Sequence, residues 1–258
     1  MIFGLNLFLF AVTIFGGLLP VIYSKWSDSK MNYLLTFSGA YLLSVNMLHL
    51  IPESAEVLGF EMGLYLLIGF FLQQVLQRFT HGVEHGHTHI GHGHRSLPVV
   101  GLIIGMSVHA LGEGIPLGAI YYEESTTPAL YLAIALHKLP EAMLIASLLM
   151  HNKQRKTTAL AVLAGFALLS PASSLLTHYF GLQTELFAHA LPYLIATVAG
   201  SFLHIGTTIF YESGNTAHAI SWRKWLTTIA AIGLALLTTL GNHQHIDGPK
   251  PHIHNHSH

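Results

Sequence analysis

Apolar runs of about 20 residues recur along the whole chain and are separated by short polar segments. A helix rises about 1.5 Å per residue, so each run is long enough to cross the hydrocarbon core of a bilayer. The pattern predicts an all-α polytopic membrane protein with eight transmembrane helices. The predicted spans are Ile2–Tyr23, Met31–Ile51, Phe60–Leu76, Leu97–Tyr121, Ala129–Met150, Thr157–Thr177, Phe187–Phe210 and Trp225–Leu240.

The composition agrees with a membrane protein. Of the 258 residues, 52% are hydrophobic and 9% are charged, whereas soluble domains carry about 25% charged residues. The net charge of −1 argues against nucleic acid as a partner. The chain has no cysteine, so any metal must be held by nitrogen and oxygen. The first apolar run lacks a preceding basic region, which indicates a membrane span and not a cleaved signal peptide.

Basic residues predict the orientation. They fall on alternate loops, while the other loops between the predicted spans are acidic. By the positive-inside rule the basic loops are cytoplasmic, so both termini are expected to be extracytoplasmic, in a plasma (inner) membrane. The basic residues are Lys25, Lys30, Arg78, Arg95, Lys153, Arg155, Lys156, Arg223 and Lys224.

Two phrases in the middle of predicted spans place a histidine four residues before a glutamate. They are His109 with Glu113 and His137 with Glu141. Residues four apart share one face of a helix. A carboxylate at the centre of a bilayer costs about 2.5–3.5 kcal/mol, so two of them beside histidines need a reason other than packing. A single membrane histidine is more often an interhelical hydrogen-bonder, but two such pairs at matching depth predict a metal site.

The two spans that carry these phrases are joined by a short loop and are therefore expected to be antiparallel neighbours. Facing each other, they offer two imidazoles and two carboxylates to one point. Zn²⁺ accepts four such ligands in a tetrahedron at about 2.0–2.2 Å. Fe²⁺, Mn²⁺, Co²⁺ and Cd²⁺ accept similar ligands, so the spacing does not fix the metal. Gly112, Gly114 and Gly118 leave backbone close to the site and are expected to help helices approach or bend there.

Two histidine-rich segments lie outside the predicted spans. One is the cytoplasmic loop at 79–96, and the other is the extracytoplasmic tail at 242–258, after a transporter domain at 1–241. Such segments bind divalent metals weakly and multivalently, although a polar linker, or for the tail an expression tag, is the alternative. The loop histidines predicted to capture metal are His81, His85, His87, His89, His92 and His94.

The chain also contains internal repetition. The two His-x-x-x-Glu phrases lie in adjacent spans that cross in opposite directions. A fainter match links Leu42–Ser54 in span two to Phe202–Ser213 in span seven. Equivalent segments that cross in opposite directions are typical of inverted-repeat transporters with a site near the midplane. This predicts a 3+2+3 inverted-repeat arrangement.

These features together resemble the ZIP family of divalent-metal transporters. The resemblance covers essentially the whole chain and is most specific in the two phrases. It extends to His49–Glu53 in span two and Gly200–His204 in span seven. It implies zinc, or a related divalent metal, as transported substrate, movement toward the cytoplasm by one helical bundle sliding against another, and often a homodimer.

The chain departs from the family pattern beside each histidine. Many members have an asparagine after the first histidine and an acidic or amide residue after the second, which together form a second metal position. Here these places hold Ala110 and Lys138, as in a branch of the family with His-Lys in span five. We therefore expect a single ion. Lys138 is expected to pair with Glu113 or Glu141, the alternative being that it reaches toward the cytoplasm.

Further polar residues within spans are predicted to line the pathway. His49 and Glu53 lie toward the outer end of span two, where an acidic mouth would concentrate cations. His204 is deep in span seven and is expected to be a transient ligand or a proton relay. For each of these residues, simple hydrogen bonding between helices is an equally good explanation.

Two other functional classes compete with uptake. An intramembrane zinc hydrolase usually carries His-Glu-x-x-His on a helix, and the chain has no such run. A six-span metal exporter also has histidine-rich loops, but eight spans and the lack of a folded cytoplasmic C-terminal domain argue against it. The chain is accordingly predicted to be a transporter and not an enzyme.

Overall fold

The computed structural model describes residues 1–23, 28–80, 99–119, 126–152, 154–212 and 221–243, and all secondary structure in these residues is helical. The prediction of an all-α protein is confirmed for this part of the chain. The elements are α1 (Ile2–Ile22), α2 (Asp28–Val45), η1 (Asn46–Leu50), α3 (Ile51–Leu58), η2 (Gly59–Glu61), α4 (Met62–Thr80), α5 (Val99–Gly118), α6 (Thr126–His151), α7 (Lys156–Gln183), α8 (Glu185–Glu212) and α9 (Trp222–His243).

Several of these helices are suited to cross a membrane. Six described segments are long and apolar enough to do so, and one of them, Ser29–Phe79, is a 51-residue stretch that contains α2 through α4. Helix α9 does not belong to this set of six. The chain is therefore an integral, multi-pass membrane protein, and the count of eight spans stays a prediction.

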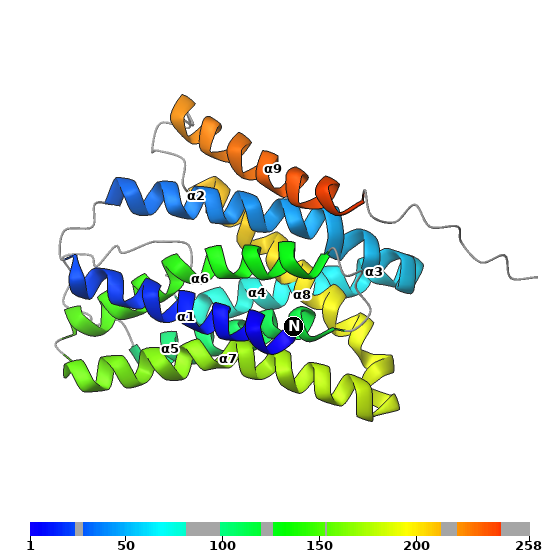
Figure 1. Ribbon diagram of the computed structural model, residues 1–258, viewed down its shortest axis with the longest axis horizontal. Helices are drawn as coiled ribbons and strands as arrows, with labels where there is room; N and C mark the ends of the chain where they lie inside the picture. The colour runs from blue at the N-terminus through cyan, green and yellow to red at the C-terminus, as the bar shows by residue number, and fades with distance from the viewer. Residues whose placement is uncertain (24–27, 81–98, 120–125, 153, 213–220, 244–258) are drawn as a thin grey trace, which may run out of the picture.

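The helices form two groups, although α2 of one group also packs against α6 of the other. In the first group, α1 lies along α6 and α7, and α5 lies along α7. In the second, α8 lies along both α4 and α2, and α2 also packs against α9. Figure 1 shows most of the long helices running roughly along the horizontal axis. We call these groups the α1/α5/α6/α7 bundle and the α2/α4/α8/α9 bundle.

A glycine lets two helices cross closely within each bundle. On α5, a Cβ added at Gly114 would lie 2.6 Å from Ser173 Cβ of α7. On α8, a Cβ added at Gly200 would lie 2.9 Å from the backbone nitrogen of Phe70 in α4. Gly118 also lies against α7, as expected, but Gly112 has open space around its Cα. The expectation that Gly112 helps helices approach was wrong, because it lies on the face of α5 that borders a cavity.

Span two is longer than predicted and is interrupted by a widened turn. Helix α2 continues through the π-helical η1 into α3, which ends at Leu58, seven residues beyond the predicted end. Pro52 lacks a backbone N–H and cannot complete an ordinary helical turn, which accounts for the position of the wide turn just before it. Gly59, with φ of 55°, then ends α3 in a conformation that favours glycine.

Candidate metal centre

Helices α5 and α6 bring the two His-x-x-x-Glu phrases to one point. One ligand atom from each of the four residues lies within 4.8 Å of the others. His109 Nε2 lies 3.3 Å from Glu113 Oε1 and 3.4 Å from Glu141 Oε1, so it spans the two helices. On α6, His137 Nε2 lies 3.4 Å from Glu141 Oε1. We call these residues the central cluster: His109, Glu113, His137 and Glu141.

The central cluster is removed from solvent, and the atoms that converge in it have no hydrogen-bond partner. His109 is 3% exposed, and the other three side chains are no more than 1% exposed. Nε2 of both histidines and Oε1 of both glutamates are buried without a hydrogen-bond partner. Buried polar atoms in native proteins are nearly always satisfied, and each exception needs an explanation. A cation bound by these atoms would satisfy all four at once.

Lys138 completes the charge balance of the site. Its side chain is 1% exposed, and its Nζ forms ion pairs with both glutamates, at 2.7 Å from Glu141 Oε2 and also with Glu113 Oε2. Each carboxylate is thus divided between two partners. One oxygen contacts the ammonium group, and the other faces the histidines.

Helix α7 supports the site from behind. Ser170 Oγ donates to the carbonyl of Ala110 at 2.8 Å and contacts Glu113 Oε2 at 3.4 Å. The Phe166 ring lies under Lys138, with 4.7 Å from Nζ to the ring centroid. Ala110 is fully buried against this helix. No residue spacing in the sequence points to Ser170 or Phe166, because their role depends on which face of α7 packs against α5.

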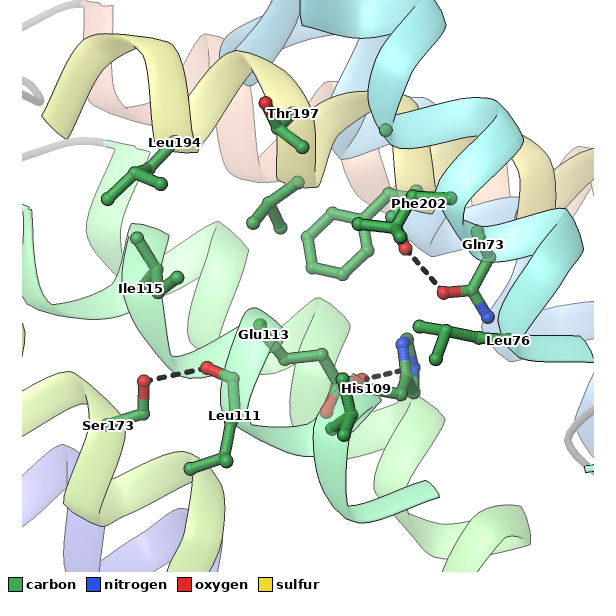
Figure 2. Close-up of a pocket in the computed structure, with 16 residues that line it drawn as sticks. Gln73, Leu76, His109, Leu111, Glu113, Ile115, Ser173, Leu194, Thr197 and Phe202 are labelled. Carbon is green, nitrogen blue, oxygen red and sulfur yellow. Dashed lines mark hydrogen bonds and ion pairs between the residues drawn. The ribbon is translucent and has the colours of Figure 1, made fainter. Parts of the chain in front are cut away.

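A cavity of about 340 Å³ borders one side of the central cluster. Figure 2 shows His109 and Glu113 at its wall, with Gln73 of α4 and Phe202 of α8 across from them. The wall is largely apolar, and Ser201 Oγ donates to Gln73 Oε1 at 2.8 Å. The cavity therefore separates the part of α5 that carries two cluster residues from the α4–α8 pair.

The residues predicted near the outer mouth form a separate site. His49 lies on the widened turn η1, and its Nδ1 is 3.5 Å from Glu53 Oε1. His49 Nε2 also shares a hydrogen bond of 2.9 Å with Thr239 Oγ1 of α9. His49 is buried, whereas the side chain of Glu53 is 25% exposed. Among the described residues, neither belongs to a group of three or more metal-ligating side chains.

His204 is likewise held away from the central cluster. Its Nε2 shares a hydrogen bond of 2.9 Å with Gln77 Oε1 of α4, and its ring meets Phe70 edge to face. The interhelical hydrogen bond that was the alternative to a pathway role is present in the structure, as it is for His49. The loop histidines and the histidine-rich tail lie outside the described residues.

Comparisons with known proteins point in the same direction as the geometry. No family model matches the sequence. The curated relatives include zinc transporter ZIP9-A of Xenopus laevis, 29% identical over 61% of this chain and 54% of the relative. Zinc transporter ZIP9 of Macaca fascicularis is 32% identical over 45% of this chain and 52% of the relative, and that of Micropogonias undulatus is 30% identical over 65% and 56%. The chain spans about half the length of the curated relatives it matches.

Proposed function

We propose that this chain, which belongs to the ZIP family, carries zinc or a related divalent metal across a membrane through the central cluster. The observation that carries the proposal is the convergence of four buried ligand atoms, none with a hydrogen-bond partner, inside a membrane protein. Two imidazole nitrogens and two carboxylate oxygens form a tetrahedral set suited to Zn²⁺. The relatives are named as zinc transporters, which agrees with zinc as the substrate.

The cluster holds one ion, with Lys138 in place of a second. A second divalent cation would need the Oε2 atoms of Glu113 and Glu141, and both of these contact the ammonium group. A cation cannot ligate another cation. When the site is empty, the lysine keeps the two buried carboxylates from repelling each other.

Transport proceeds by movement of the α1/α5/α6/α7 bundle against the α2/α4/α8/α9 bundle. The close glycine crossings of α5 on α7 and of α4 on α8 support rigid bundles. The cavity between α5 and the α4–α8 pair supports a boundary at which they separate. The helix contacts also fit an inverted repeat in which α1 corresponds to α7 and α2 to α8. The contact of α1 with α6 then corresponds to that of α7 with α5, and the contact of α2 with α9 corresponds to that of α8 with α4. This correspondence supports an eight-span, 3+2+3 inverted repeat.

Transport toward the cytoplasm rests on the resemblance to the ZIP family, and the charge of the loops supplies only the orientation of the chain. With basic loops cytoplasmic and both termini outside, His49 and Glu53 lie toward the entrance side. Metal then leaves toward the cytoplasm, where the loop at 79–96 would capture it. His204, which lies in α8 of the α2/α4/α8/α9 bundle, is a transient ligand of the metal on this path. The inner membrane as the location and a homodimer as the assembly stay predictions.

The test is uptake of radioactive zinc into proteoliposomes that contain the purified protein. The double variant His109→Ala/Glu141→Ala removes one ligand from each helix and is expected to reduce uptake to the level of empty liposomes. The variant Glu185→Gln, which removes an exposed charge at the start of α8, is the matched control and should retain uptake. Equal flux through the double variant and the wild type would exclude the central cluster as the transport site. Zinc that stays bound through dialysis without any flux would favour the hydrolase instead.

A further inference from the structure

A second pocket lies where α2 and α9 begin. It is more polar than the cavity beside the central cluster. Its volume is about 480 Å³. Both helices start at the same end of the molecule, on the left in Figure 1, and run side by side from there. We call it the α2–α9 pocket, and its lining residues are Ser29, Asn32, Tyr33, Ser221, Trp222, Arg223 and Lys224.

Lys224 is the unusual residue in this pocket. It is only 7% exposed, and its ammonium group has no ion pair or side-chain hydrogen bond with the side chains that the structure describes, which do not include those of Asp28 and Glu212. Lysine is almost never this buried unless it is paired. The other buried lysine of the described chain, Lys138, contacts two carboxylates. A largely buried lysine that lines a cavity, with no carboxylate partner among the described side chains, favours an anion from outside the chain as its partner.

The rest of the pocket suits a phosphate group. Arg223 adds a second cation, and the guanidinium group is a good phosphate ligand. Hydroxyl groups of Ser29, Tyr33 and Ser221 and the amide of Asn32 supply neutral donors. Two helices begin here, and the first N–H groups of a helix have no acceptor within that helix. Donors and positive charge therefore converge from both walls.

We propose that the α2–α9 pocket binds the phosphate of an anionic phospholipid headgroup. The surface next to it favours a lipid over a soluble anion. Trp222 and Trp225 are 68% and 50% exposed, and tryptophan is enriched at the membrane–water interface. Beyond them, exposed apolar side chains follow one side of α9, which gives an acyl chain a continuous path. They are Leu226, Ile229, Ile232, Leu236 and Leu237.

Binding here would fix α2 to α9 at the basic face of the protein. Both helices belong to the α2/α4/α8/α9 bundle, and they also meet at their other ends through His49 and Thr239. The lipid would thus act on the α2/α4/α8/α9 bundle and leave the ligands of the central cluster untouched. The inference does not depend on zinc transport, only on the chain being embedded in a membrane.

The test measures retention of phosphatidylglycerol by the full-length protein in detergent, using native mass spectrometry. The variant Lys224→Met should bind it about fivefold more weakly, because one basic group near the headgroup is lost. Two comparisons control for general charge. The variant Arg155→Gln/Lys156→Gln, at the start of α7 on the same face, should bind as the wild type does, and zwitterionic phosphatidylcholine should be retained weakly by all three proteins.

Thermal unfolding separates the alternatives. Phosphatidylglycerol should raise the Tm of the wild type but not that of Lys224→Met, and in lipid-free detergent the two proteins should unfold alike. A lower Tm for Lys224→Met without lipid would reveal a carboxylate partner within the chain and overturn the proposal. Equal retention of phosphatidylglycerol by all variants would also overturn it. Stabilisation by inorganic phosphate alone, with no added effect of lipid, would overturn the lipid assignment in favour of a soluble phosphate.

Discussion

The chain carries the pattern His-x-x-x-Glu three times, but only two copies converge. The pairs on α5 and α6 face each other in the buried interior, with a lysine between their carboxylates. The third pair, His49 and Glu53, has the same helical spacing, yet it meets Thr239 of α9 and a partly exposed surface. The local spacing sets which face a side chain occupies, while the packing of helices decides whether that face meets another ligand.

The two regions also differ in what compensates the negative charge of their carboxylates. In the central cluster, both carboxylates are nearly fully buried, and Lys138 provides the compensating charge. At the third pair, the side chain of Glu53 is 25% exposed, so solvent screens part of its charge. Four variants test this contrast, beginning with the one expected to have the largest effect.

The largest effect is expected from Lys138→Met. This change leaves two buried carboxylates without their cation, and breaking a buried ion pair in this way costs about 3–5 kcal/mol. The Tm of the protein in chelator should therefore fall strongly, and added zinc should recover much of the loss because the metal supplies the missing charge. Circular dichroism melting with and without zinc measures both effects. Lys156→Met, an exposed substitution on α7, is the control and should change neither value. An unchanged Tm in chelator would contradict the role of Lys138.

The next effect is expected from loss of a ligand carboxylate. Glu141→Gln should weaken zinc binding by at least about 100-fold, since removal of even a group that only supports a ligand costs about 10–100-fold. Glu53→Gln removes a carboxylate from the same sequence pattern and should leave equilibrium zinc affinity unchanged. Isothermal titration calorimetry of the two variants compares them directly. If both variants lost affinity equally, the third pair would have to be counted as part of the site.

A smaller effect is expected from filling the crossing of α5 on α7. Gly114→Ala places a methyl group within 2.9 Å of the Ser174 backbone nitrogen, and such overpacking costs about 1–3 kcal/mol. Gly112→Ala adds the same methyl group two residues away, where nothing lies within 4 Å. It should be neutral or slightly stabilising, because alanine favours a helix interior. Tm values of the two variants test the placement of α5, and equal values would contradict it.

The smallest effect is expected from His49→Gln/Glu53→Gln at the outer pair. Loss of the carboxylate lowers the local concentration of cations, so uptake at limiting zinc should fall a few-fold while the maximal rate is unchanged. Zinc-dependent uptake by proteoliposomes measures both quantities. A lower maximal rate would instead show that the pair takes part in the movement of the bundles.

The sequence predicts the chemistry of this protein better than its helix contacts. The periodicity of His109 with Glu113 and of His137 with Glu141 is local, so the shared faces can be read from spacing alone. The division of each carboxylate around Lys138 depends on how α5 meets α6, which no spacing determines. The error over Gly112 has the same origin, since only packing reveals which glycine of α5 faces α7. The α2–α9 pocket was also missed, because its two walls are nearly 200 residues apart in the chain.

The division of the carboxylates has a consequence for the electrical side of transport. If both histidines of the empty site are neutral, its two carboxylates and one ammonium group give a charge of −1, and a bound divalent ion changes it to +1. Each proton held by His109 or His137 would raise the charge of the empty site by one. The cost of placing a charge in a low-dielectric medium depends on its square, so the empty and loaded sites are equally expensive to carry across. An inside-negative voltage, which contributes about 2.3 kcal/mol per charge at 100 mV, favours inward movement of the loaded site and also outward return of the empty one. Voltage would assist both halves of the cycle, and uptake in polarised liposomes that did not respond to voltage would contradict this.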